Sequence, residues 1–311
     1  MTVTNAHLSW ISPEWKERGD SRWQQALRLQ QSWWRETRLG LPAGPRTGGS
    51  RLVSSMLPTE VDLSRNLMTE AAVAAAERAI HDLAAERRPG LIQYDRLRRN
   101  LLSSQPLCFN LFGHLASDPS ALLEWVRSFQ NDVDTVDDVR LEWAPLTGNT
   151  GGSAFDAFVT YTRSDGAQGF LGIECKYAEN LAKAQPRPAH DKFKAETTNG
   201  PWKEGAETRL DRPGLRQFWY NQLLTQRVTS STDFAEGTGV VVACQDDIAA
   251  REVVESICAE LDDPAALRFS SINEVVDAVT GNGAWCRDFT ERYLTYDRIP
   301  ERMAQAKLSS I

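Results

Sequence analysis

The chain has 311 residues, of which 41% are hydrophobic and 25% are charged, the composition of an ordinary soluble globular protein. It contains no run of about eighteen apolar residues and no signal-peptide pattern at its N-terminus, so we expect a cytoplasmic protein without a membrane segment. The five cysteines are widely spaced and form no CxxC or Cys/His cluster, which argues against structural zinc and for reduced thiols.

The net charge of −7 is unfavourable for a protein that binds nucleic acid, but the charge is unevenly distributed. Residues 230–311 contain 15 acidic and 7 basic residues, so the remaining 229 residues carry a net charge of about +1. A local basic surface is therefore compatible with the composition.

The N-terminal part begins with an amphipathic pattern over Asp20–Arg38, which predicts a helix capped by Ser21 or Asp20. Its tryptophans alternate with arginines, so they either anchor the helix on the core or stack on bases. The Pro/Gly-rich stretch 41–51 is the clearest boundary in the chain, and it lacks the G-x-x-x-x-G-K-[ST] phosphate-binding pattern.

An alanine-rich helix is predicted over Met68–Arg88, ending at Pro89-Gly90. A basic cluster follows it, made of Arg87, Arg88, Arg96, Arg98 and Arg99. This cluster is the strongest candidate in the sequence for contact with a phosphate backbone; the alternative is a solvated helix end.

The first core helix is predicted over Gln105–Phe129, with Ser104 or Gln105 as its cap and Pro106 in its first turn. Gln105 and Asn110 are polar residues near its start that are placed to face a site. A short strand is expected at Val139–Trp143.

A β-hairpin is predicted from the strands Ala154–Tyr161 and Gly169–Tyr177, joined by a turn near Asp165-Gly166. Because strand side chains alternate, Glu174 and Lys176 project from the same face. A strict two-residue turn would place Asp156 on the opposite face. We therefore predict an odd-numbered loop or a bulge, which brings Asp156 opposite Glu174.

Asp156, Glu174 and Lys176 would then converge, and their chemistry suits a metal site. Two neighbouring carboxylates repel each other unless a cation lies between them, and oxygen ligands suit Mg²⁺. A lysine beside them can orient a water molecule or stabilise charge on a phosphoryl oxygen. The alternative is an exposed Glu–Lys pair on a half-solvated strand.

Residues 178–212 resemble a long basic insertion that contacts substrate or becomes ordered on binding it. A helix is predicted over Pro213–Val228, on which Gln217 and Asn221 share one face. The expected elements after it are a buried strand at Thr238–Cys244, a helix at Asp247–Leu261, an edge strand at Leu267–Ser271 and mostly helix over 273–308. This order predicts an α/β fold with a mixed central β-sheet flanked by helices.

The spacing D-x(17)-E-x-K of Asp156, Glu174 and Lys176 resembles the PD-(D/E)xK nuclease superfamily, which has the restriction-endonuclease-like fold. The wider chain is similar to a bacterial branch with an SSQxLxFNLFG helix, here at 103–113, and a later helix that carries Gln and Asn. The resemblance covers roughly residues 100–245. The chain departs from it because no proline precedes Asp156 and no acid appears on the first core helix before Asp118, where the superfamily often has a glutamate.

The resemblance implies a Mg²⁺- or Mn²⁺-dependent endonuclease that hydrolyses phosphodiester bonds in DNA, with RNA left open. Asp156, Glu174 and the backbone carbonyl of Cys175 would hold the cation. Lys176 would position or deprotonate the attacking water, and Gln217 would bind the water or a phosphate. The candidate nucleic-acid contacts are Gln105, Asn110, Asn221, Arg87, Arg88, Arg98 and Arg99.

Three parts are expected: a helical N-terminal region 1–99 on or next to the core, a nuclease core 100–272 with the insertion 178–212, and a helical C-terminal extension 273–311. A homodimer and an activating protein partner both stay open, as does a role in defence or repair. The competing hypothesis is a catalytically silent nucleic-acid-binding or regulatory protein on the same fold. A Ser-His-Asp hydrolase lacks support, since no G-x-S-x-G occurs.

Overall fold

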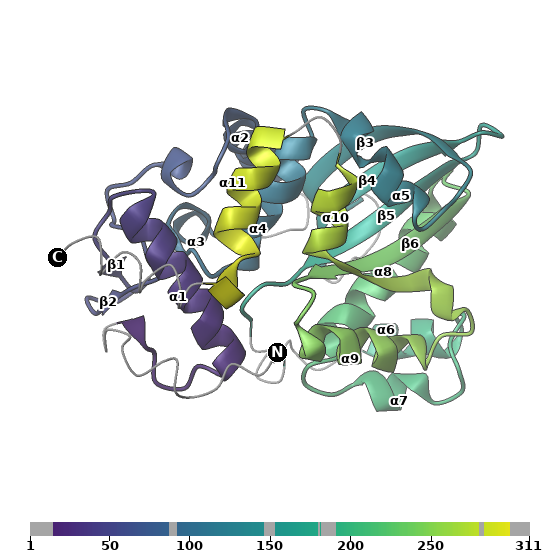
Figure 1. The fold of residues 1–311 in the computed structure, drawn as a ribbon. Helices are drawn as coiled ribbons and strands as arrows, with labels where there is room; N and C mark the ends of the chain where they lie inside the picture. Colours follow the sequence, from purple (N-terminus) through teal and green to yellow (C-terminus); the bar gives the residue numbers. More distant parts are fainter. Residues whose placement is uncertain are drawn as a thin grey trace.

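The computed structural model describes residues 15–86, 92–145, 153–179, 181, 191–279 and 283–298. Its centre is a five-stranded sheet in the order β3-β4-β5-β6-β7 (Figure 1). The antiparallel strands are β3 (Val133–Trp143), β4 (Phe155–Arg163) and β5 (Gln168–Cys175), to which β6 (Glu236–Ala243) and β7 (Leu267–Ser271) add in parallel. The predicted α/β class with a mixed sheet is confirmed, and β7 has the predicted bounds.

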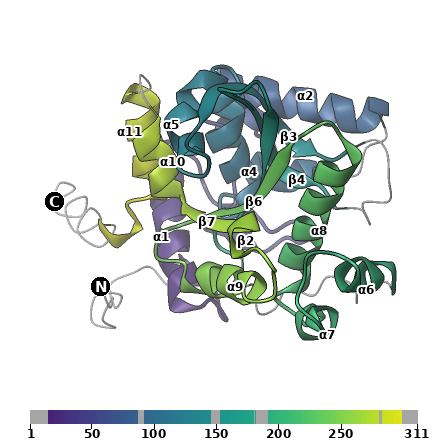
Figure 2. The same ribbon diagram turned by 90° about the vertical axis from the view of Figure 1, so that its right-hand side faces the viewer.

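Helices cover both faces of this sheet (Figure 2). On one face lie α2 (Glu70–Glu86), α4 (Ser104–Cys108), α5 (Leu123–Arg127), α10 (Ile272–Ala278) and α11 (Gly283–Tyr293), over the largest apolar cluster. On the other face lie α8 (Arg216–Ser231) and α9 (Ile248–Cys258), with the short α6 (Asp191–Thr198) and α7 (Ala206–Leu210) outside them. None of the described helices is long and apolar enough to span a membrane.

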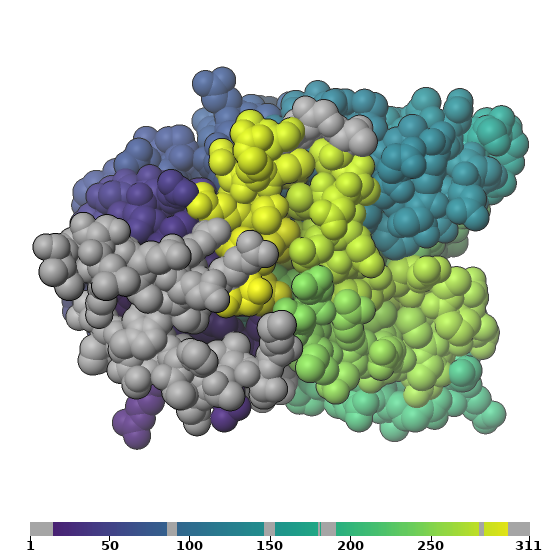
Figure 3. All heavy atoms as spheres, viewed as in Figure 1, coloured from purple at the N-terminus to yellow at the C-terminus, as the bar shows by residue number. Residues whose placement is uncertain are grey.

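The N-terminal part packs against the C-terminal helices. The helix α1 (Arg22–Thr37) begins at Ser21, whose hydroxyl accepts a hydrogen bond from the Gln24 backbone, as predicted. The strands β1 (Gly44–Pro45) and β2 (Leu52–Val53) and the helix α3 (Tyr94–Arg99) follow. Figure 3 shows α11, in yellow, between the N-terminal part in purple and the sheet-containing part in teal and green.

A buried polar network joins these N- and C-terminal elements. The guanidinium of Arg292 donates to the backbone and side-chain oxygens of Asn66, and the amide of Gln31 donates to the Arg292 carbonyl at 3.0 Å. Leu27 and Tyr293 belong to the same apolar cluster as the sheet. The predicted division into three parts stays a prediction, but these contacts tie both ends of the described chain to its centre.

The prediction of one helix over Gln105–Phe129 is wrong. The helical run begins one residue earlier, after Ser103 as its cap, and it ends before the 3₁₀ turn Pro119–Leu122, which leads into α5. Asp118 has non-helical backbone angles, since proline disfavours the helical conformation of the residue before it and has no N–H to donate.

The predicted insertion 178–212 is in part packed structure. Its residues 182–190 lie outside the described chain, but α6 and α7 follow, and Phe193, Trp202 and Leu210 are buried against α8 and α9. The strand β3 is longer than predicted, because it also includes Asp134, Asp137 and Asp138, acids that the edge position of the strand leaves accessible to solvent.

Gly172 on β5 lies under the ring of Phe155, where an added Cβ would come within 2.4 Å of the ring. We expect Gly172→Ala to lower the free energy of unfolding by about 1–3 kcal/mol, because the ring has to move within a packed core. Urea denaturation measures this loss. Gly49→Ala is the control, since its nearest atom would be 3.8 Å away. Equal stability of Gly172→Ala and wild type would contradict this packing.

Candidate active site

The hairpin register brings the two predicted carboxylates together. Ala157 pairs with Ile173 and Thr162 with Gln168, and the backbone N–H of Arg163 donates to the Ala167 carbonyl, so the three-residue turn 164–166 joins the strands and Asp156 lies opposite Glu174. The predicted odd-numbered loop is therefore confirmed. The carboxylate of Asp156 also accepts a hydrogen bond from the backbone N–H of Cys175 at 2.8 Å, which fixes it against the end of β5.

Glu174 and Lys176 form a buried ion pair at the end of β5. Each side chain is 6% exposed. The helix α8 completes the group: the amide of Gln217 donates to Glu174 at 2.6 Å and accepts from the Lys176 ammonium at 3.2 Å. Asn221 donates to the other oxygen of Glu174. The alternative of an exposed pair on a half-solvated strand is therefore wrong.

The electrostatics of the site follow from burial and from like charges. Burial raises the pKa of Asp156 well above its usual value, and repulsion from Glu174 and Glu142 raises it further. For Lys176, burial disfavours the charged form, but the carboxylates of Glu174, Asp156 and Glu179 outweigh burial and raise its pKa. Lys176 is therefore an ammonium at neutral pH.

Glu142, at the end of β3, is a residue that the sequence analysis missed. It is 8% exposed and accepts a hydrogen bond from the Gln105 amide at 2.6 Å. Among the described residues it is the one non-glycine with a positive φ, 50°, a conformation that costs about 1–3 kcal/mol. The sequence signal was an acid inside the predicted strand Val139–Trp143.

The donor chemistry of the site fits a hard divalent cation. Asp156 and Glu174 offer carboxylate oxygens from adjacent strands, and Mg²⁺ is usually held by one or two carboxylates together with water and substrate phosphates. Within the described ranges, no three His, Cys, Asp or Glu side chains are grouped closely enough to enclose a metal ion. The side chains as they stand therefore suit an open site rather than a cage of protein ligands.

The residues predicted to contact nucleic acid fall into three groups: two amides at the site, one buried asparagine and the arginine cluster. Gln105 and Asn221 lie at the site, bound to Glu142 and Glu174. Asn110 is fully buried and bonds to Met68, Asn66 and Tyr293, so its assignment to nucleic-acid binding is wrong.

Two of the described arginines of the cluster, Arg98 and Arg99, are bound within the protein, whereas Arg96 is exposed. Arg99 is buried and binds Asp95 and the carbonyls of Pro45 and Leu57, so its assignment to nucleic-acid binding is also wrong. Arg98 donates to the carbonyls of Thr59 and Val61, and Arg87 and Arg88 lie outside the described residues.

Comparison with protein families finds a match over residues 18–295 to the PD-(D/E)XK nuclease superfamily. No curated protein and no solved structure matches the chain. The match spans most of the chain, including the strands that carry Asp156, Glu174 and Lys176, and the mixed sheet with its flanking helices is consistent with the fold of this superfamily. Both observations lead to one assignment: the chain belongs to the PD-(D/E)XK nuclease superfamily.

Proposed function

We propose that the protein is a divalent-metal-dependent nuclease that hydrolyses phosphodiester bonds in DNA. Membership in the superfamily points to a nuclease, and the superfamily typically uses a divalent metal. The observation that carries the proposal is the buried Glu174–Lys176 pair next to Asp156, with α8 amides bound to it. Burying an ion pair and a further carboxylate is costly, which favours a catalytic over a structural role.

Asp156, Glu174 and the backbone carbonyl of Cys175 are the proposed groups that hold Mg²⁺ or Mn²⁺. Such a cation polarises the scissile phosphate and lowers the pKa of bound water. Lys176 is paired with Glu174, and we assign its ammonium to stabilising negative charge on a phosphate oxygen. Gln217 orients both Glu174 and Lys176 and is a positioning residue.

A groove of about 810 Å³ provides the proposed path for the DNA backbone. Its walls are α1, the β1–β2 hairpin and α3, and it reaches Ala178 and Glu179, just beyond Lys176 in the chain. Five arginines line it: Arg18, Arg28, Arg46, Arg51 and Arg96.

The charges in this groove favour an anionic ligand. Its four carboxylates are all used within the protein: Glu17 and Asp20 pair with Arg51 and Arg28, Asp95 pairs with Arg99, and Glu179 accepts from backbone N–H groups. Arg18, Arg46 and Arg96 are exposed and pair with no acid among the described residues. These three replace Arg98 and Arg99 as our candidates for phosphate contact.

The second candidate function is DNA binding without cleavage. It is favoured by the state of Glu174, whose two oxygens already accept from Lys176, Gln217 and Asn221. A cation would have to compete with these three donors. Cleavage assays separate the two functions.

The first prediction concerns cleavage. Wild type should nick or linearise supercoiled plasmid with Mg²⁺ or Mn²⁺ and not with EDTA. Glu174→Gln and Lys176→Ala should each lower the rate by about 10²–10⁴-fold, because each removes a charge that acts on the transition state. Asp138→Asn, an exposed carboxylate on β3, is the control. Binding without cleavage by wild type would instead support the second function.

The second prediction concerns stability. In EDTA, Asp156→Asn should raise the melting temperature, because it removes a buried charge repelled by Glu174 and retains an oxygen for the Cys175 N–H. Each kcal/mol gained corresponds to about 2–4 °C for a chain of this size. Added Mn²⁺ should stabilise wild type and leave the variant unchanged. A lower melting temperature of the variant in EDTA would contradict the repulsion.

The third prediction concerns the groove. For a DNA duplex in EDTA, the double variant Arg46→Ala/Arg96→Ala should bind more weakly than wild type. The slope of log affinity against log salt concentration should become shallower by about 0.9 for each phosphate that the variant no longer neutralises. Arg268→Ala, an exposed arginine on β7 outside the groove, should bind as wild type does. An unchanged slope in the double variant would refute the assignment of the groove.

A further inference from the structure

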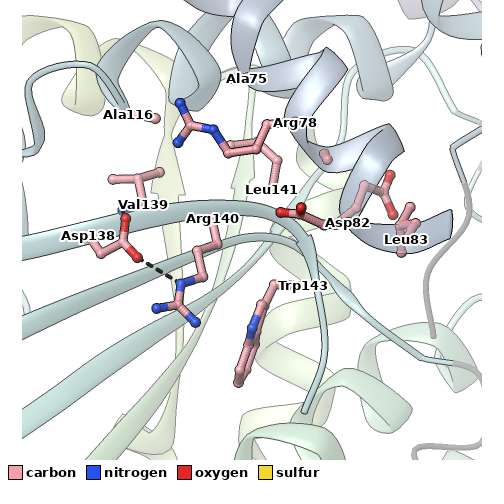
Figure 4. Close-up of a pocket in the computed structure, with 12 residues that line it drawn as sticks. Ala75, Arg78, Asp82, Leu83, Ala116, Asp138, Val139, Arg140, Leu141 and Trp143 are labelled. Atoms are coloured by element: carbon pink, nitrogen blue, oxygen red, sulfur yellow. Dashed lines mark hydrogen bonds and ion pairs between the residues drawn. The ribbon is translucent and has the colours of Figure 1, made fainter. Parts of the chain in front are cut away.

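The face of the sheet that α8 covers carries a cluster of aromatic side chains towards its β3 edge. Its buried members are Leu224 and Val228 of α8 and the rings of Phe155, Phe158 and Phe170. Trp143 and Phe234 pack against them and are partly exposed. Trp143 stacks on Phe158, with ring centroids 3.9 Å apart and 21° between the planes. Figure 4 shows Trp143 and Arg140 on the side of β3 that faces away from Arg78 of α2.

A pocket of about 260 Å³ opens at this cluster. The rings of Trp143, Phe158 and Phe234 line it, and Arg140 and Thr232 are exposed at its rim. The indole N–H of Trp143 is buried and has no hydrogen-bond partner in the part of the chain that the structure describes. Such a donor is unfavourable, and an acceptor on a ligand would satisfy it. The pocket therefore suits a flat group with polar atoms at its edge.

The pocket lies close to the proposed cleavage site. The ring of Phe155 lies against Gly172 of β5, and Glu174 projects from the same face two residues further along. Trp143 is on β3, two strands from Glu174, which corresponds to about 10 Å across the sheet. Bases in a stacked strand are about 3.4 Å apart. A base in the pocket would thus belong to a nucleotide about three positions from a phosphate at Glu174.

A nucleobase fits this pocket better than a phosphate or a peptide does. The charge of Arg140 is offset by Asp138, at 2.7 Å, so the pocket favours a neutral group. A specific protein interface buries about 800 Å² on each partner, far more than a pocket of this size offers. Every base has a flat π face that stacks on aromatic rings. A base within a duplex is stacked between its neighbours, whereas an unpaired base leaves the stack at little cost.

We propose that the pocket formed by Trp143, Phe158 and Phe234 binds one unpaired base of the substrate DNA. The protein then favours DNA with an unpaired nucleotide near the cleaved bond over a fully paired duplex. This inference rests on the proposed function and adds a substrate preference to it. Trp143 and Phe234 are its specificity-determining residues, because they are the rings of the pocket that are partly exposed.

The test is the binding of three DNA duplexes to the full chain in EDTA, measured by fluorescence anisotropy at one salt concentration. The first duplex is fully paired, the second has an unpaired adenine at its centre, and the third has an unpaired nucleotide without a base at that place. Wild type should bind the second duplex most tightly. Trp143→Ala should lower the affinity for this duplex by about 5- to 150-fold and leave the other two affinities unchanged.

Two further variants separate stacking from folding. Trp143→Phe retains an aromatic ring and should retain most of the preference for the unpaired base. Phe234→Ala should lose the preference, and it decides the test if Trp143→Ala does not fold. Phe129→Ala is its matched control, since Phe129 is a partly exposed ring that packs on the other face of the sheet. This control should bind all three duplexes as wild type does.

The remaining outcomes overturn the pocket or separate it from the proposed function. Equal wild-type affinity for the second and third duplexes would overturn it and leave a side chain of a partner protein as the occupant. An equal loss for all three duplexes in Trp143→Ala would also overturn it. Plasmid cleavage without any preference for the unpaired base would overturn the pocket alone. A preference that depends on Trp143, without cleavage by wild type, would support the pocket and the second candidate function.

Discussion

The carboxylate of Glu174 and the ammonium of Lys176 are buried side by side at the end of β5. Much of the surrounding structure supplies hydrogen-bond partners for these two groups. A buried ion pair is stable only when its remaining hydrogen-bonding groups find partners. Gln217 and Asn221 supply these partners from α8, the helix that leads from β5 to the parallel strand β6. The crossover that builds the mixed sheet thus also delivers the amides of the proposed active site.

At the end of the sheet where this ion pair lies, carboxylates repel one another and the backbone is strained. Asp156 is repelled by neighbouring carboxylates, and Glu142 has an unfavourable backbone conformation. The core beneath supports both, since Ala157 and Ile173, next to the acids on β4 and β5, are fully buried. Proteins commonly concentrate such local costs at functional sites and offset them by packing elsewhere.

The N-terminal elements form the structure next to this end of the sheet. The helix α1 is tied to α11 through Gln31 and Arg292, and it forms one wall of the arginine-lined groove. Arg99, by contrast, binds Asp95 and backbone carbonyls and holds the loops of this part together. Arginines close in sequence thus have different roles, because their burial differs.

The sequence by itself determined what depends on local spacing: the Ser21 cap, the odd-numbered hairpin loop and the shared face of Gln217 and Asn221, because alternation and helical periodicity act within a few residues. It also carried the family motif, Asp156, Glu174 and Lys176. Only the tertiary structure placed Glu142 opposite Asp156 and buried Asn110 and Arg99. Pairing across strands and burial depend on contacts between residues distant in sequence, which local patterns do not specify.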